Sequence, residues 1–259
     1  PFEKPVMTDL LNKAAQLGIR TLALSEDAGG AGADNLTTCI VLEELASGEV
    51  DVATILGTTA ALGRSLFDTL MNAEQKGRYL KSFVDDDSYH LAFAGTTMEA
   101  GIGWTYHRDA YDEGVIVPTA VKHGSDWVIN GRVDAVSNAP LAKLFAVQVR
   151  TDSKKTGMNG LSTFLIPRDT AGFKVQSAIA AFGGTDNTLT RWHHGTAAAI
   201  ELKDCKVPAA NLLGKEGGCP FADGKLLARN VVASAAISLG VGRASYDAAV
   251  DYAKMRRQG

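Results

Sequence analysis

Four short runs of strand-forming residues near the middle of the chain constrain its fold more than any other feature. They lie at residues 127–129, 133–136, 144–149 and 161–166. Their aliphatic and aromatic side chains favour β-structure, and the Asn130-Gly131 pair between the first two runs suits the positive φ angles of a type I′ hairpin turn. Because Pro167 closes the last run and turn residues separate the others, the pattern predicts an antiparallel sheet.

Apolar residues at helical spacing flank this region on both sides. Before it, helices are predicted from an N-cap at Thr8 to Gly18, from Leu36 to Gly48, from Val52 to about Met71, and from Ala73 to Val84. After it, residues 221–258 are predicted to form one long helix or a kinked pair. In that segment Ala236, Gly240, Ala244 and Ala248 fall four apart, which favours close packing against another helix, within the subunit or across a symmetric interface.

These elements divide the chain into three parts, which makes it an α+β multidomain protein. We expect an N-terminal helical bundle at residues 1–88, an antiparallel β domain of barrel or sandwich form at 89–212, and the start of a C-terminal helical bundle at 213–259. The chain opens with Pro1 rather than Met and close to a helix, so we expect it to be a fragment of a longer protein.

Charge and cysteine usage exclude several classes of function. The net charge is −3 and the basic residues are spread along the chain, which argues against nucleic acid or an anionic membrane surface as a partner. Cys39, Cys205 and Cys219 are far apart and form no C-x-x-C pair, so they suit a reducing cytoplasm rather than a disulfide framework or a zinc site. No apolar run approaches the roughly 18 residues that span a bilayer.

Two polar segments invite a ligand-binding interpretation that the residues do not favour. The glycine-rich stretch 26–34 lacks both common phosphate-loop patterns, so a tight turn between helices is the better interpretation. His193 and His194 would point to opposite faces of a strand, which favours a surface loop or a substrate-side insertion over a metal site. We therefore predict no metal centre.

Several motifs, in the right order along the chain, resemble those of the acyl-CoA dehydrogenase family. Residues 25–32 resemble its Pro-Glu-x-x-Gly-Gly-x-Gly loop, with Ser25 in place of the proline, and residues 169–173 resemble its D-T-P-G-F turn. Residues 202–214 resemble its closing strand and loop, and residues 252–259 resemble its Y-x-x-x-R-x-Q-F-G element without the Phe. The resemblance implies a flavoprotein oxidoreductase with a helical domain, a β domain and a C-terminal helical domain.

The same resemblance implies which residues contact FAD. Ala135, Val136 and Ser137 stand where the family has a Trp/Phe-hydrophobic-Thr/Ser run facing the flavin, so the Ser137 hydroxyl would hydrogen-bond the ring edge. Residues 91–103 lie where the family has its T-E-P-x-A-G-S-D signature, which places Phe93, Gly95 and Thr96 against the flavin. Arg256 and Gln258 would reach the FAD of a neighbouring subunit, where a guanidinium can pair with the pyrophosphate.

On the substrate side the resemblance implies Gly101, Ile102 and Arg229, and here the chain departs from the family pattern. Ile102 replaces a serine that helps hold the pyrophosphate and the thioester arm, and Ala135 replaces the aromatic residue that covers one flavin face. One position that carries the catalytic base in some members is Ala228, and the other lies beyond the end of the chain. We therefore name no catalytic residue and expect the base outside this chain.

The resemblance implies α,β-oxidation of an acyl-CoA thioester, in which a carboxylate takes the α-proton and flavin N5 takes the β-hydride. Electrons would pass to an acceptor such as an electron-transfer flavoprotein, and the protein would be a cytoplasmic homodimer or homotetramer, with a heteromer also open. Two alternatives remain: a flavin monooxygenase or oxidase on the same scaffold, and a non-catalytic partner subunit of a heteromeric dehydrogenase.

Overall fold

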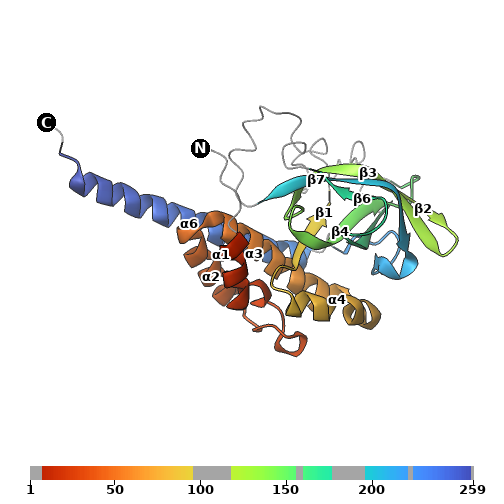
Figure 1. Cartoon of the computed structure of the whole chain (residues 1–259), viewed down its shortest axis with the longest axis horizontal. Helices are drawn as coiled ribbons and strands as arrows, with labels where there is room; N and C mark the ends of the chain where they lie inside the picture. Colours follow the sequence, from red (N-terminus) through yellow and green to blue (C-terminus); the bar gives the residue numbers. More distant parts are fainter. Residues whose placement is uncertain (1–7, 96–117, 156–159, 177–195, 221–223, 258–259) are drawn as a thin grey trace.

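The structure is a computed structural model that describes residues 8–95, 118–155, 160–176, 196–220 and 224–257, without the side chains of 224–231. Its helices and its sheet form two adjoining bodies, and a long C-terminal helix runs past both (Figure 1). The predicted α+β fold class is confirmed. The domain boundaries proposed from the sequence stay predictions.

The N-terminal part is helical, as predicted. Its helices are α1 (Thr8–Gln16), α2 (Asn35–Gly48), α3 (Val50–Gly63) and α4 (Ala73–Asp85). Helix α3 continues into a π-helical segment, Arg64–Leu70, so the predicted run to Met71 is helical almost throughout. A short 3-10 turn at Ile19–Thr21 precedes the glycine-rich stretch, and a second one at Glu26–Ala28 begins it.

Local capping explains where two of these helices begin. The Asp34 carboxylate accepts a hydrogen bond from the Thr37 amide at 2.7 Å and so satisfies one of the free N–H groups at the start of α2. At the start of α4, the Asn72 side chain accepts from the Gln75 amide at 2.9 Å, and Gln75 accepts in turn from the Asn72 amide at 3.2 Å. This reciprocal capping box fixes the first turn of α4.

The middle part is one eight-stranded sheet. Its strands are β1 (His90–Ala94), β2 (Thr119–His123), β3 (Asp126–Ser137), β4 (Ala142–Arg150), β5 (Leu161–Pro167), β6 (Phe173–Val175), β7 (Ala197–Pro208) and β8 (Leu212–Leu213). The order is β6-β7-β3-β2-β4-β5-β8, and β1 pairs with β4 outside this path. The predicted strands at 144–149 and 161–166 are confirmed as β4 and β5.

The sheet differs from the expected antiparallel barrel or sandwich in two ways. Strands β1 and β2 both pair with β4 in parallel, so the sheet is mixed. Within the described ranges β6 and β8 stand at opposite ends of the strand order, so the sheet is not closed. The parallel pairs arise because β1 and β2 reach β4 through long connections, which the local alternation of side chains does not reveal.

The predicted hairpin turn at Asn130-Gly131 is wrong, because both residues lie inside the single strand β3. This strand pairs with β7 from Asp126 to Ser137, with a shift of register between Ile129 and Gly131. Gly131 has φ 141°, and a Cβ there would lie 2.6 Å from the Pro118 Cα, so the glycine serves a bulge rather than a turn. The real hairpin joins β2 and β3 at Gly124, whose φ is 64°.

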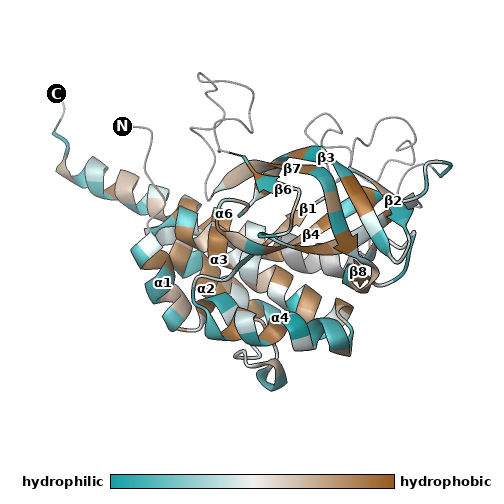
Figure 2. Cartoon of the chain, turned by 45° about the vertical axis from the view of Figure 1, so that its right-hand side comes forward, coloured by the Kyte–Doolittle hydropathy of each residue, from teal (hydrophilic) through white to brown (hydrophobic). Residues whose placement is uncertain are grey.

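Two apolar clusters hold these parts together. One fills the sheet, where Trp127 meets Phe164 edge to face with ring centroids 5.5 Å apart. The other lies between the sheet and the helices, where Phe67 stacks on Phe83 at 4.9 Å and Leu91 of β1 is fully buried. The helices lie along one side of the sheet (Figure 2), so the second cluster sets the position of α3 against β1.

Helix α6 (Gly224–Met255) packs on α2 as far as Arg243, and the predicted close approach is confirmed there. A Cβ on Gly240 would lie 2.2 Å from the Glu43 carbonyl oxygen, and Arg243 pairs with Glu43 at 3.0 Å and with Glu44 at 2.7 Å. The turns after Arg243 project away from the body (Figure 1), and Tyr246 there is 69% exposed. Among the helices of the described ranges, none combines the length and hydropathy that crossing a bilayer requires.

Candidate functional site

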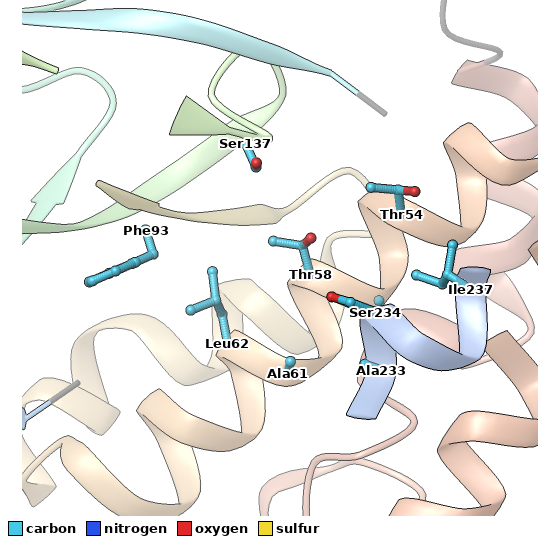
Figure 3. A pocket seen from close by; sticks show the side chains of 10 residues that line it. Thr54, Thr58, Ala61, Leu62, Phe93, Ser137, Ala233, Ser234 and Ile237 are labelled. Carbon is cyan, nitrogen blue, oxygen red and sulfur yellow. The ribbon is translucent and has the colours of Figure 1, made fainter. Parts of the chain in front are cut away.

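A pocket of about 240 Å³ lies where the helices, the sheet and α6 meet. Helix α3, strand β1, the end of β3 and helix α6 supply its walls (Figure 3). Its lining residues are Thr54, Gly57, Thr58, Ala61, Leu62, Phe93, Ser137, Ala233, Ser234 and Ile237. Hydroxyl groups and apolar surface therefore share the pocket, and no charged side chain is among these ten described residues.

Phe93 and Ser137, which the family resemblance assigns to the flavin, both line this pocket although they lie on separate strands. Ser137 is the last residue of β3, and within the described part of the chain its hydroxyl has no hydrogen-bond partner. Val136 points the other way, into the apolar cluster of the sheet, while Ala135 is exposed on the same side of the strand as Ser137. The strand end thus presents one hydroxyl and one small side chain outward.

Gly95 directly follows β1 and lies close to a buried acceptor. A Cβ on Gly95 would lie 2.7 Å from the Phe93 ring and 3.1 Å from Gln148 Oε1, so the chain passes tightly between them. Gln148 is fully buried, its Nε2 donates to Cys219 Sγ at 2.7 Å, and its Oε1 has no partner among the described residues. A buried acceptor without a donor is costly, so a ligand N–H or O–H group is a suitable partner for it.

Of the remaining predicted site residues, the structure places only the side chain of Arg256, and it lies away from this pocket. Arg256 is exposed beyond the end of α6, where it donates to the Tyr252 hydroxyl at 2.9 Å. That position is roughly 28 Å along the helix from the pocket residue Ile237, at 1.5 Å per residue. Thr96, Gly101, Ile102 and Gln258, the segment with His193 and His194, and the side chain of Arg229 all lie outside the described residues.

The sequence interpretation missed the helical walls. Thr54, Thr58 and Ala61 recur at spacings of four and three residues in α3, which puts them on one face of that helix. On α6 the pocket wall consists of two small residues, Ala233 and Ser234, and the apolar Ile237. Small residues and hydroxyl side chains on one helical face were the available signal, but in an unaligned sequence such a face equally fits helix packing.

Behind the pocket lies a buried histidine, His90, at the start of β1. Its imidazole is 3% exposed and its Nδ1 is 3.2 Å from the hydroxyl oxygen of Thr59 on α3. The pKa of His90 is lowered from 6.5 to about 4, mainly by burial and also by the nearby charges of Arg20 and Lys143, against the opposing effect of Asp86. The imidazole is therefore neutral at physiological pH.

Comparison with known proteins adds to this geometry. The profile of the acyl-CoA dehydrogenase N-terminal domain matches residues 3–87, and that of the middle domain matches residues 102–194. The mitochondrial isobutyryl-CoA dehydrogenase of Dictyostelium discoideum is 30% identical over 258 residues, and an acyl-CoA dehydrogenase of Bacillus subtilis is 31% identical over 253. These alignments cover 96% of this chain, and they cover 55% and 61% of the two relatives.

Solved structures align over nearly the whole chain as well. Butyryl-CoA dehydrogenase from Megasphaera elsdenii superposes with a TM-score of 0.79 at 27% identity, covering 96% of this chain and 61% of that one. A chain in the structure reported for the electron transferring flavoprotein of Acidaminococcus fermentans superposes with a TM-score of 0.81 at 26% identity, covering 97% and 61%. The chain thus spans about three fifths of the length of these proteins.

Proposed function

The chain belongs to the acyl-CoA dehydrogenase family, and from that premise we propose that the protein is an FAD-dependent oxidoreductase acting on an acyl-CoA thioester. One observation carries the proposal. Phe93 and Ser137, the aromatic and hydroxyl residues assigned to the flavin, meet in one pocket that α3 and α6 complete. A pocket with a few placed polar groups among apolar side chains is the usual form of a small-molecule site.

The residues present fit a flavin ring. The Ser137 hydroxyl has no partner within the described ranges and can hydrogen-bond the ring edge, while the Phe93 ring offers an aromatic surface beside it. Gln148 Oε1, near Gly95, can accept from an N–H or O–H of the same ligand. FAD, when bound, supplies an acceptor for hydride, and these residues would hold and orient it.

The other walls would hold the acyl group. Leu62 of α3 and Ile237 of α6 offer apolar surface that excludes water, and the hydroxyl of Thr58 points into the pocket between them (Figure 3). Because no carboxylate lines the described pocket, the base that takes the α-proton would come from elsewhere in the protein. An electron-transfer flavoprotein as acceptor and a homodimer or homotetramer as the working form are part of the same proposal.

A second candidate, an oxidase or monooxygenase, is favoured by one observation. Ala135 is exposed on the side of β3 that Ser137 also faces, where the family pattern has a bulky aromatic residue. A less covered flavin would be more open to oxygen. Absorbance spectra of the purified holoprotein, recorded with acyl-CoA without oxygen and then in air, distinguish the candidates. Bleaching of the flavin followed by slow reoxidation in air supports a dehydrogenase, and fast reoxidation supports an oxidase. No bleaching supports a non-catalytic subunit.

Replacing Ser137 with alanine is expected to weaken FAD binding by several fold and to shift the flavin reduction potential. The change removes one hydrogen bond, worth ~1 kcal/mol net, and leaves the strand intact. Titration of apoprotein with FAD, followed by flavin fluorescence, measures the first effect. Ser137→Thr keeps the hydroxyl and is the control. A wild-type protein that neither carries flavin nor can be reconstituted with it would show that the proposed function is wrong.

Replacing Arg256 with alanine is expected to leave the free energy of unfolding within about 0.5 kcal/mol of wild type, because the side chain is exposed. FAD retention should fall, since a charge-assisted pair between the guanidinium and the pyrophosphate in the neighbouring subunit is lost. Arg257→Ala, at the adjacent exposed position, is the matched control. Sedimentation accompanies the measurement, and a monomer that retains FAD and oxidises acyl-CoA would contradict the shared site.

A further inference from the structure

Asn138, the residue after Ser137, uses its side-chain amide to contact three acceptors on other elements. Its side chain is 1% exposed, and its amide nitrogen Nδ2 lies 3.0 Å from the Ile55 carbonyl oxygen, 3.2 Å from Thr59 Oγ1 and 3.3 Å from the Leu91 carbonyl oxygen. An amide has two N–H donors, so these three acceptors share them. The side chain is thus held from three directions in a place that water does not reach.

Each of the three residues that accept from Asn138 is one or two positions along the chain from a residue that lines the pocket. Ile55 and Thr59 directly follow Thr54 and Thr58 on α3. Leu91 is two residues before Phe93 on β1, and Asn138 itself follows Ser137 at the end of β3. One amide group therefore ties together three of the four walls of the pocket, leaving only α6 outside its reach.

The backbone of Asn138 is fixed separately from its side chain. Its φ is 65°, in the left-handed region that asparagine adopts more readily than other residues with a side chain. Its amide donates to the Thr196 carbonyl at 2.7 Å, and its carbonyl accepts from Leu141 at 2.9 Å and from Ala142 at 2.8 Å. Glycine can take up this backbone conformation, so a substitution can separate the turn from the side-chain contacts.

Thr59 extends the connection to His90. Because Thr59 Oγ1 accepts from Asn138, its own proton is available for the His90 Nδ1 at 3.2 Å. The neutral imidazole is then an acceptor at Nδ1, which assigns its proton to Nε2. Thr59 is in this way held between the end of β3 and the start of β1.

We propose that Asn138 is the positioning residue of this pocket: its buried amide, with Thr59, holds the Ser137 hydroxyl at a set place relative to α3 and β1. The inference rests on the proposed function, since Ser137 is there the residue that contacts the flavin. Asn138 acts through Ser137 and the two other walls, and does not itself line the pocket.

The test compares Asn138→Gly with wild type in the full protein. Glycine keeps the left-handed turn and loses the three contacts, so FAD is expected to bind several fold more weakly, as in Ser137→Ala, and the flavin reduction potential is expected to shift. In a Ser137→Ala background, Asn138→Gly should weaken FAD binding little further, because both substitutions disturb the same contact between Ser137 and the flavin. Thr59→Val should reproduce part of the effect, and Thr59→Ser, which keeps the hydroxyl, should restore it.

Val207→Ala is the control for a general loss of stability, since Val207 is buried in the sheet cluster away from the pocket. It should lower the melting temperature without changing the potential. Wild-type affinity and potential in Asn138→Gly, or effects that add fully to those of Ser137→Ala, would overturn the proposal. If Asn138→Gly fails to fold, the FAD affinity and flavin potential of Thr59→Val and Thr59→Ser test the proposal instead: a loss in the first that the second restores supports it, and wild-type values in Thr59→Val overturn it.

Amide hydrogen exchange of the protein without FAD separates this proposal from the proposed function. Asn138→Gly should speed exchange in residues 54–59 and at the end of β3, where the amide joins the walls. Unchanged exchange there overturns the role of Asn138 whatever the ligand. A wild-type protein that does not bind FAD overturns the proposed function, and the exchange result alone then supports or overturns the positioning role.

Discussion

Replacing Gly240 with leucine is expected to lower the free energy of unfolding by about 1 to 3 kcal/mol, the usual range for overpacking. A Cβ at this position would lie 2.2 Å from the Glu43 carbonyl oxygen and 3.0 Å from the Ala46 Cβ. The nearer atom is helical backbone, which cannot rotate away as a side chain can, so α2 and α6 must separate. Denaturant unfolding of the variant and the wild type measures the difference.

Gly242→Leu is the matched control, because it lies on the same helix and nothing lies within 4 Å of a Cβ there. It should stabilise the protein by up to ~1 kcal/mol, since leucine has a much higher helix propensity than glycine. The two substitutions are therefore expected to have opposite signs. Equal effects would mean that the contact between α2 and α6 does not contribute to stability.

Acidification from pH 7 to pH 4.5 is expected to remove about 2 kcal/mol of stability through His90 alone. The pKa of His90 is lowered from 6.5 to about 4 in the folded protein, mainly by burial. Because the unfolded chain binds this proton more readily, the stability is fully present above pH 6.5 and is lost as the pH falls from about 6.5 to 4. The free energy of unfolding, measured at several pH values in this window, gives its slope against pH.

The free energy of unfolding of His90→Gln should lack the part of the pH dependence that His90 contributes, because glutamine does not titrate. Asp86, whose pKa is lowered by hydrogen bonds from Lys143 and Ser88 despite an opposing effect of burial, affects both proteins and cancels in the difference. A wild-type slope in His90→Gln would show that another group is responsible.

Much of the fold could be predicted from the sequence because its signals are local. Apolar spacing marks α1, α2 and α4, capping side chains mark the starts of α2 and α4, and the apolar runs of β4 and β5 end at charged residues or proline. Asn130-Gly131 misled the prediction because the same pair that suits a hairpin also suits a bulge. The partner strand β7 decides between the two: the Asp204 amide donates to Asn130 Oδ1 at 2.7 Å and holds the pair within the ladder.

The site was partly predictable for a similar reason. Phe93 and Ser137 could be named because they stand in short motifs, whereas Thr58 and Ile237 become neighbours only when α6 packs beside α3. Asn138 gave no signal of its own, since its importance depends on three partners far from it in the chain. Arg256 was named from a motif, but its proposed ligand belongs to another subunit.

The separation of those partners has a consequence for the order of folding. Asn138 contacts residues 83, 79 and 47 positions away, so the intervening chain must lose the entropy of long loops before these contacts form. Contacts of this kind tend to form after local helices and hairpins. We expect the walls of the pocket to be joined late in folding, so that weakening this junction mainly speeds unfolding and changes the folding rate little.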